Sequence, residues 1–102
     1  MKFFRNIYKL TQPFPKDKLF GQTAQIRRAV VSIPINITEG AARTGAKEFA
    51  QFLNIARGSL NELESQLLIT ADLRYIKNDN SVFTLVDRFS RLITGPHKVV
   101  RA

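Results

Sequence analysis

The sequence predicts an all-α fold, an antiparallel up-and-down four-helix bundle. Two observations predict it. Four segments, at about residues 3–11, 17–39, 46–75 and 82–93, repeat their apolar residues at the three- and four-residue spacing of an amphipathic helix. Stretches with Pro, Gly or Asn separate these segments, and such short connections favour antiparallel neighbours.

The length and composition favour one small domain, which we expect to cover residues 1–102. Hydrophobic residues make up 44% of the chain, so a single core can form. The absence of Cys excludes a disulfide framework, a thiolate zinc site and a Cys nucleophile. His97 is the single His, which leaves no multi-His metal site. We therefore expect no metal and no other cofactor.

The first helix, at 3–11, is short and must pack on a neighbour to be stable. It ends before Pro13 and Pro15, because a residue that precedes Pro avoids the helical conformation. Its apolar side chains lie near one face, which is formed by Phe4, Ile7, Tyr8 and Leu10.

The second helix, at 17–39, has a rival interpretation. Residues 31–38 alternate β-branched and polar side chains, as a strand does. Pro34 disfavours a central strand, and the chain offers no second strong strand for pairing. We therefore predict a helix that Pro34 kinks by removing a hydrogen bond to the Val30 carbonyl. Its apolar stripe is Leu19, Thr23, Ile26, Val30, Ile33 and Ile37.

The third helix, at 46–75, has the clearest pattern, a heptad seam from Phe49 to Thr70. Thr44 or Gly45 can cap its start. Gly58 lies mid-helix, where Gly costs about 1 kcal/mol relative to Ala, so we expect close packing of a neighbour there. Apolar residues also lie off the seam, which predicts burial on more than one side and hence against other subunits; the alternative is a monomer in which they are scattered surface residues. They are Phe52, Ile55, Leu68, Ile69 and Leu73.

The fourth helix, at 82–93, presents apolar residues on one face, and Ser81 is its expected N-cap. Gly95 and Pro96 are expected to stop it, leaving a frayed tail at 96–102.

Charge gives the main functional indication. The chain has 16 Lys and Arg residues against 8 Asp and Glu, a net charge of +8. This excess attracts polyanions such as nucleic acid, although small domains also carry a net charge of about 2–8 for solubility alone. The longest uncharged apolar stretch, 29–38, is far shorter than the roughly 20 residues of a membrane span, and Arg5 interrupts any signal peptide. We expect a cytoplasmic protein with no membrane contact.

Several basic residues are candidates for phosphate contacts. Those on the second helix and its exit could form one surface, and two more give the fourth helix a basic edge. Arg27 and Arg28 can equally pair with Glu62 or Glu64 of the third helix, and the sequence leaves both interpretations open. Aromatic residues accompany cations at 3–5 and 8–9, where we expect core anchors rather than base stacking. The candidates are Lys16, Lys18, Arg27, Arg28, Arg43, Lys47, Arg88 and Arg91.

No group of residues in the sequence indicates catalysis. Glu62 and Glu64 are two residues apart, so they lie on different sides of a helix and form no carboxylate pair. Glu39 and Arg43 have the spacing of an exposed ion pair. The sequence contains no phosphate-binding loop, nucleotide fingerprint or Ser-centred triad, so we expect no enzyme.

The run QIRRAVVSIPINITEG at 25–40 resembles the signature of the four-helix bundle proteins linked to 23S ribosomal RNA intervening sequences. The similarity keeps the family's order and spacing over about residues 3–94, and it implies a helix at 32–38. Members usually begin with additional upstream residues, and Thr44 to Ala46 replaces a basic pair that is often seen there. Similar segments lie at 7–11, 14–16, 21–23, 47–49, 52–53, 56–60 and 62–67.

The resemblance implies a small helical bundle without catalytic residues. Some members of this family are homopentamers, and one branch serves diversity-generating retroelements as an accessory protein that binds reverse transcriptase and nucleic acid. We therefore expect a non-enzymatic homo-oligomer, a pentamer in some relatives, that binds RNA or DNA through its basic residues. The alternative is a protein-interaction subunit, such as a reverse-transcriptase accessory protein.

Overall fold

A computed structural model describes the backbone of residues 2–77 and 80–101 and the side chains of residues 3–77 and 80–93. In these ranges the chain is all-α, with four helices and no strand. The strand interpretation of residues 31–38 is therefore excluded, because these residues are helical. The helices are α1 (Lys2–Thr11), α2 (Lys16–Ala41), α3 (Ala46–Asp72) and α4 (Ser81–Arg101).

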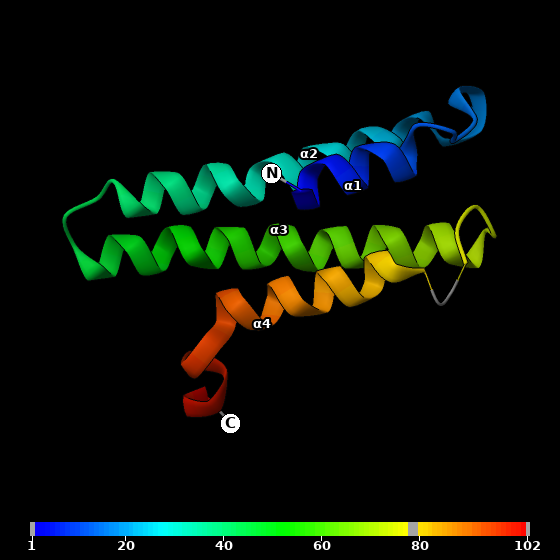
Figure 1. The fold of residues 1–102 in the computed structure, drawn as a ribbon. Coiled ribbons are helices and arrows are strands. Elements are labelled where there is room, and N and C mark those ends of the chain that lie inside the picture. The colour runs from blue at the N-terminus through cyan, green and yellow to red at the C-terminus, as the bar shows by residue number, and fades with distance from the viewer. Residues whose placement is uncertain (1, 78–79, 102) are drawn as a thin grey trace.

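The two long helices α2 and α3 lie side by side and form the body of the molecule (Figure 1). The shorter α1 packs on the first half of α2, and α4 packs on α3 and also touches α1. The α1–α2 and α3–α4 connections lie at one end of the molecule, and the α2–α3 connection lies at the other. The ends of α2 and α3 next to their connection extend beyond α1 and α4.

The core lies between α2 and α3, with α1 and α4 closing one side. Ile26 and Ile33 of α2 and Leu63 of α3 are completely buried, as the helical stripes predict. Ile7 from α1 and Val86 from α4 complete this apolar cluster. Fully burying one such side chain stabilises the fold by about 1.5–3 kcal/mol, which explains why these short amphipathic helices hold together.

Helix α2 is irregular near its start rather than being ended by its proline. Pro34 lies inside α2, whereas the backbone leaves helical values at Leu19, with φ −119° and ψ 20°. The Leu19 N–H still donates to the Pro15 carbonyl oxygen at 2.8 Å, and its side chain is buried. The first turn of α2, which carries Lys16 and Lys18, is therefore offset from the rest of the helix.

Helix α3 ends at Asp72, three residues before the predicted end. Arg74 adopts the left-handed conformation with φ 68°, and its N–H donates to the Ala71 carbonyl at 2.9 Å. The Tyr75 N–H donates to the Thr70 carbonyl at 3.1 Å. These two bonds form a Schellman motif, in which Gly is the usual left-handed residue. Arg at this position gave no sequence signal for the end of the helix.

Helix α4 continues beyond its expected stop. It was predicted to end at Gly95 and Pro96, but it extends to Arg101 and changes direction in its last part (Figure 1). A proline removes one hydrogen bond and bends a helix without necessarily ending it. The backbone is therefore helical as far as residue 101, beyond the predicted end of this helix at residue 93. The side chain of His97 lies outside the described residues.

The close approach expected at Gly58 is not made by the described part of this chain, although Ala56 beside it is completely buried. An added Cβ at Gly58 would meet nothing within 4 Å. The close approach involves Gly40 of α2, where a Cβ would lie 2.8 Å from the Cβ of Phe52 and 2.9 Å from the Cδ1 of Phe49. Gly40 therefore lets α2 approach the aromatic first turns of α3.

Candidate nucleic-acid interface

The eight candidate cations occupy three places. Lys16, Lys18, Arg27 and Arg28 belong to the first half of α2, and Arg88 and Arg91 belong to α4. Arg43 and Lys47 flank the α2–α3 connection at the other end of the molecule. The nearest members of the two groups, Arg28 and Arg43, are separated by roughly 22 Å along the helix axis at 1.5 Å per residue. The single surface expected along α2 and its exit is therefore divided in two.

Arg27 is held by α1, not by a carboxylate. Its Nε donates to the Thr11 Oγ1 at 3.0 Å, and its Cζ lies 4.4 Å from the centre of the Tyr8 ring. The buried Thr11 hydroxyl is placed by the Ile7 carbonyl oxygen at 3.1 Å. A guanidinium stacks well on an aromatic face, so Arg27 is fixed in orientation. The structure thus gives Arg27 a structural contact, but with α1.

The proposed pairing of Arg27 or Arg28 with Glu62 or Glu64 is absent from the described part of the chain. The two ion pairs found there are Arg43–Glu39 and Arg91–Asp87. Arg28 is exposed, and Arg27 is half-buried. Both cations therefore remain available to an external anion.

A pocket of about 270 Å³ lies beside Arg27, between the end of α1 and the first half of α2. Two cations, Lys16 and Arg27, line it, and no carboxylate does. Phe20 also lines it and is 73% exposed. The remaining lining residues are Thr11, Gln12, Phe14, Thr23 and Ala24.

Phe20 is the residue that the sequence reasoning missed. It lies outside the apolar stripe of α2, next to the buried Leu19, and two lysines precede it closely. The sequence signal for Phe20 was an aromatic residue that lies outside the apolar stripe of α2 and close to Lys16 and Lys18. Phe3 is indeed a core anchor, half-buried and stacked on Phe89 with 5.1 Å between ring centres.

The cations at the far end of α2 are partly engaged. The predicted i,i+4 pair is present, with the Arg43 Nη2 at 3.4 Å from the Glu39 Oε2, and both side chains are exposed. The Cζ of Arg43 also lies 5.1 Å from the centre of the Phe52 ring. Lys47 is exposed in the first turn of α3. Exposed pairs contribute little stability, but they reduce the charge that is free for phosphate.

The basic edge of α4 is engaged in the same way. The Arg91 Nε lies 3.1 Å from the Asp87 Oδ2, and both side chains are largely exposed. Arg88 is exposed beside this pair. In the described part of the chain, Arg88 is thus the α4 candidate whose charge a carboxylate does not offset.

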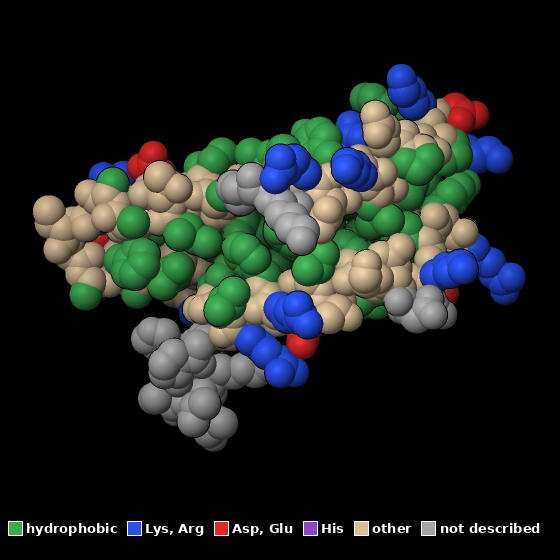
Figure 2. Space-filling model, viewed as in Figure 1, with side chains coloured by type: hydrophobic (Ala, Val, Ile, Leu, Met, Phe, Trp, Pro, Cys, Tyr) green, Lys and Arg blue, Asp and Glu red, His purple; other side chains and the backbone are tan. Residues whose placement is uncertain are grey.

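Helix α1 adds cations that were not among the candidates. Arg5 and Lys9 are exposed on α1, which packs on the first half of α2. Figure 2 shows Lys and Arg side chains over α1, around the end where α1 meets α2, and over α4. We call the residues on the first two helices the α1–α2 basic region: Arg5, Lys9, Lys16, Lys18, Arg27 and Arg28.

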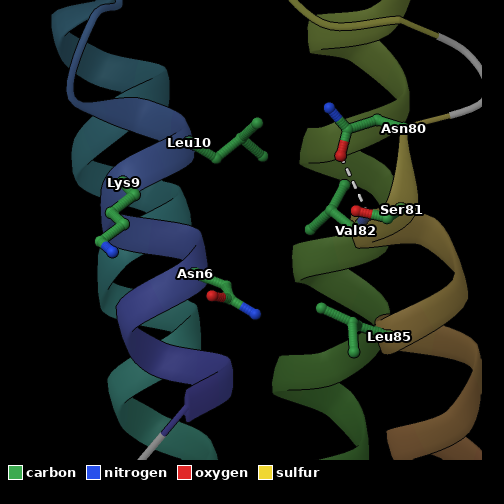
Figure 3. A pocket seen from close by; sticks show the side chains of 7 residues that line it. All are labelled: Asn6, Lys9, Leu10, Asn80, Ser81, Val82 and Leu85. Atoms are coloured by element: carbon green, nitrogen blue, oxygen red, sulfur yellow. Dashed lines mark hydrogen bonds between the residues drawn. The ribbon is translucent and has the colours of Figure 1, made fainter.

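A second pocket, of about 370 Å³, separates α1 from the start of α4 (Figure 3). Leu10 points across it toward α4, while Asn6 borders it lower on α1. The Asn80 Oδ1 accepts a hydrogen bond from the Val82 N–H at 2.9 Å, so Asn80 caps α4 in place of the expected Ser81. The residues that line this second pocket offer amide, hydroxyl and ammonium groups but no carboxylate: Asn6, Lys9, Leu10, Asn80, Ser81, Val82 and Leu85.

The sequence profile of the 23S rRNA-intervening sequence proteins matches residues 1–95 of this chain. The chain belongs to this family. The match confirms the resemblance and covers nearly the same residues as the range of about 3–94 expected from the sequence. Among the curated proteins, none is significantly similar to this family member.

Two further features of this 23S rRNA-intervening sequence protein are the apolarity of its helices and the arrangement of possible metal ligands in its described residues. Over residues 2–77 and 80–101, no helix has the length and apolarity needed to cross a membrane. In the same ranges, no three acidic or His side chains come together where they could hold a metal ion.

Proposed function

We propose that this family member is a non-enzymatic, homo-oligomeric helical bundle that binds RNA or DNA through its basic residues. The α1–α2 basic region carries the proposal. Of its six cations, five are exposed, and none has a carboxylate partner in the described part of the chain. Asp17 is the acidic residue in the first turn of α2. Such a region attracts phosphates without regard to base sequence.

The bundle in this proposal has the antiparallel up-and-down order. The connections at alternate ends of the molecule support that order (Figure 1). A bend of α2 at Pro34 also belongs to the proposal, because proline lacks the N–H that would bond to Val30. The short connection between α1 and α2 brings α1 beside the first half of α2 and so assembles the basic region.

The outer face of α3 supports self-association. Ile55, Ile69 and Leu73 on it are 51%, 46% and 49% exposed. Glu62 lies between the two isoleucines at heptad spacing, and α3 carries four acidic residues against two basic ones. This face is therefore apolar and acidic.

The outer face of α2 offers the complementary chemistry. Arg28 is exposed, and Ile35, seven residues later, is 52% exposed. We propose that the α2 face of one copy packs on the α3 face of the next. A contact between unlike faces builds a ring when its rotation closes, and a pentamer is one such ring.

A second candidate function uses the same α3 face for a different protein. The exposed Ile55, Ile69 and Leu73 would then bind a partner such as a reverse transcriptase, with this chain as its accessory subunit. Exposed apolar residues gathered on one helix favour a protein partner of some kind. A finding that the isolated chain self-associates would favour the first candidate function, the homo-oligomer that binds nucleic acid.

Fluorescence anisotropy with an unstructured single-stranded RNA tests the binding proposal. With four phosphate contacts, affinity is expected to fall roughly 50-fold between about 50 and about 200 mM salt. The doubly substituted Lys18→Gln/Arg28→Gln protein removes two exposed cations and is expected to lower the salt slope by about 1.4. No binding at low salt would contradict the proposal.

A matched variant locates the binding surface. Arg43→Gln/Lys47→Gln removes the same charge at the far end of α2, where Arg43 is already paired with Glu39. It is expected to keep most of the wild-type slope. An equal loss in both variants would show that net charge alone drives binding and that the α1–α2 basic region has no special role.

A further inference from the structure

We propose that the pocket between α1 and α2 binds one unstacked nucleobase of a single strand and the adjoining phosphate. This inference rests on the proposed nucleic-acid binding and specifies its ligand. Phe20 supplies the stacking surface, and Arg27 with Lys16 supplies the phosphate contacts. All three residues line the same pocket of about 270 Å³.

Phe20 presents a ring with no core role. Its side chain is 73% exposed, whereas the preceding Leu19 is 2% exposed. The break of the helix at Leu19 separates the Lys16 turn from the regular helix that begins at Phe20. A single exposed Phe is common on a protein surface. This ring, however, borders a pocket that is also lined by Lys16, which precedes it in the chain, and by Arg27, which follows it. Every base has a face that can stack on such a ring.

Arg27 is already oriented for an anion. Its Nε donates a hydrogen bond to the Thr11 hydroxyl, and its guanidinium group lies over the Tyr8 ring. In the described part of the chain, its two terminal nitrogens make no hydrogen bond, and no carboxylate lies within ion-pair distance. A half-buried cation without a counter-charge favours an external one. A phosphate can accept from both terminal nitrogens at once.

The pocket fits a single base better than a larger ligand. At about 270 Å³ it lies just below the roughly 300–1,000 Å³ of pockets for drug-sized molecules. Gln12, Thr11 and Thr23 add polar groups at its wall, and the Gln12 amide can both donate to and accept from a base edge. A paired base in a duplex is already stacked and cannot enter. The ligand is therefore single-stranded.

A lipid surface is the main competing ligand, because an exposed Phe beside lysines also occurs at membrane interfaces. The site differs from such a surface in shape. The ring borders a hollow that Lys16, Thr23 and Arg27 also line, whereas membrane binding by a helix needs a broad apolar face. Vesicle binding is accordingly an outcome of the test below.

Phe20→Trp provides a direct probe, because the chain contains no Trp. Stacking of a base on the new indole is expected to quench its fluorescence when oligo(U) or oligo(dT) is added, and a matched duplex is expected to quench it far less. Leu68→Trp, on the acidic α3 at a 55% exposed position, is the control and is expected to show no quenching. Comparing the two oligomers distinguishes RNA from DNA.

Phe20→Leu tests the energetic contribution. It keeps an apolar side chain at an exposed position, so the fold is expected to be unaffected. Its affinity for the single strand is expected to fall roughly 5- to 150-fold, with the salt slope unchanged, since a base stack contributes about 1–3 kcal/mol. Phe20→Tyr is expected to restore binding.

The outcomes separate this inference from the proposed function. Salt-dependent binding by the wild type, with no loss in Phe20→Leu and no quenching in Phe20→Trp, would overturn the pocket and leave the basic region standing. No binding by the wild type at low salt would overturn both. A fluorescence change with phosphatidylserine vesicles but none with either oligomer would overturn the inference in favour of a lipid surface.

Discussion

Leu63→Ala is expected to lower the free energy of unfolding by about 3 kcal/mol. Leu63 is completely buried in the α2–α3 seam, so the truncation removes apolar burial and leaves a cavity. Leu68→Ala makes the same chemical change on the same helix at a position that is 55% exposed. It is expected to change the free energy of unfolding by less than about 0.5 kcal/mol. Urea denaturation of the two proteins measures both values.

This comparison tests the register of α3. The two positions share a helix and a residue type, so intrinsic helix propensity cancels between them. Equal destabilisation would contradict the assignment of Leu63 to the core and of Leu68 to the surface.

Gly40→Ala is expected to lower the free energy of unfolding by about 2 kcal/mol, while Gly58→Ala is expected to raise it by about 1 kcal/mol. Alanine at Gly40 places a Cβ at 2.8 Å from the Phe52 Cβ, which is anchored to the backbone of α3 and cannot swing aside. At Gly58 the new methyl meets nothing within 4 Å and only the helix propensity changes.

Thermal or urea unfolding of the two alanine variants gives the measurement. Because the substitution is identical, the opposite signs isolate the α2–α3 contact at Gly40. Stabilisation by Gly40→Ala would mean that the two helices are farther apart near their connection than described. Destabilisation by Gly58→Ala would mean that a neighbour packs on Gly58.

The helices themselves were predictable because burial repeats along the chain. The stripe through Ile26, Val30 and Ile33 and the seam through Leu60 and Leu63 both correspond to buried positions. Helix ends were less predictable, since they depend on single backbone conformations. Arg74 adopts a left-handed conformation without being Gly, and Pro96 lies within α4 without ending it.

The candidate site was predictable by residue type but not by arrangement. Composition identifies cations, yet it does not show that a helix of 26 residues keeps Lys16 far from Arg43. The contact of Arg27 with Thr11 and Tyr8 depends on how α1 lies along α2. Arg27 and Thr11 are 16 residues apart in the sequence, and this spacing alone does not predict that their side chains meet.

The central claim is that copies of this basic bundle assemble and then bind single-stranded nucleic acid as an assembly. Light scattering after size-exclusion chromatography, with and without a single-stranded RNA, tests it most directly. We predict a protein mass at a whole-number multiple of the 11.6 kDa chain, and a larger mass when RNA is added. A mass of one chain at every protein concentration, unchanged by RNA at low salt, would contradict the account.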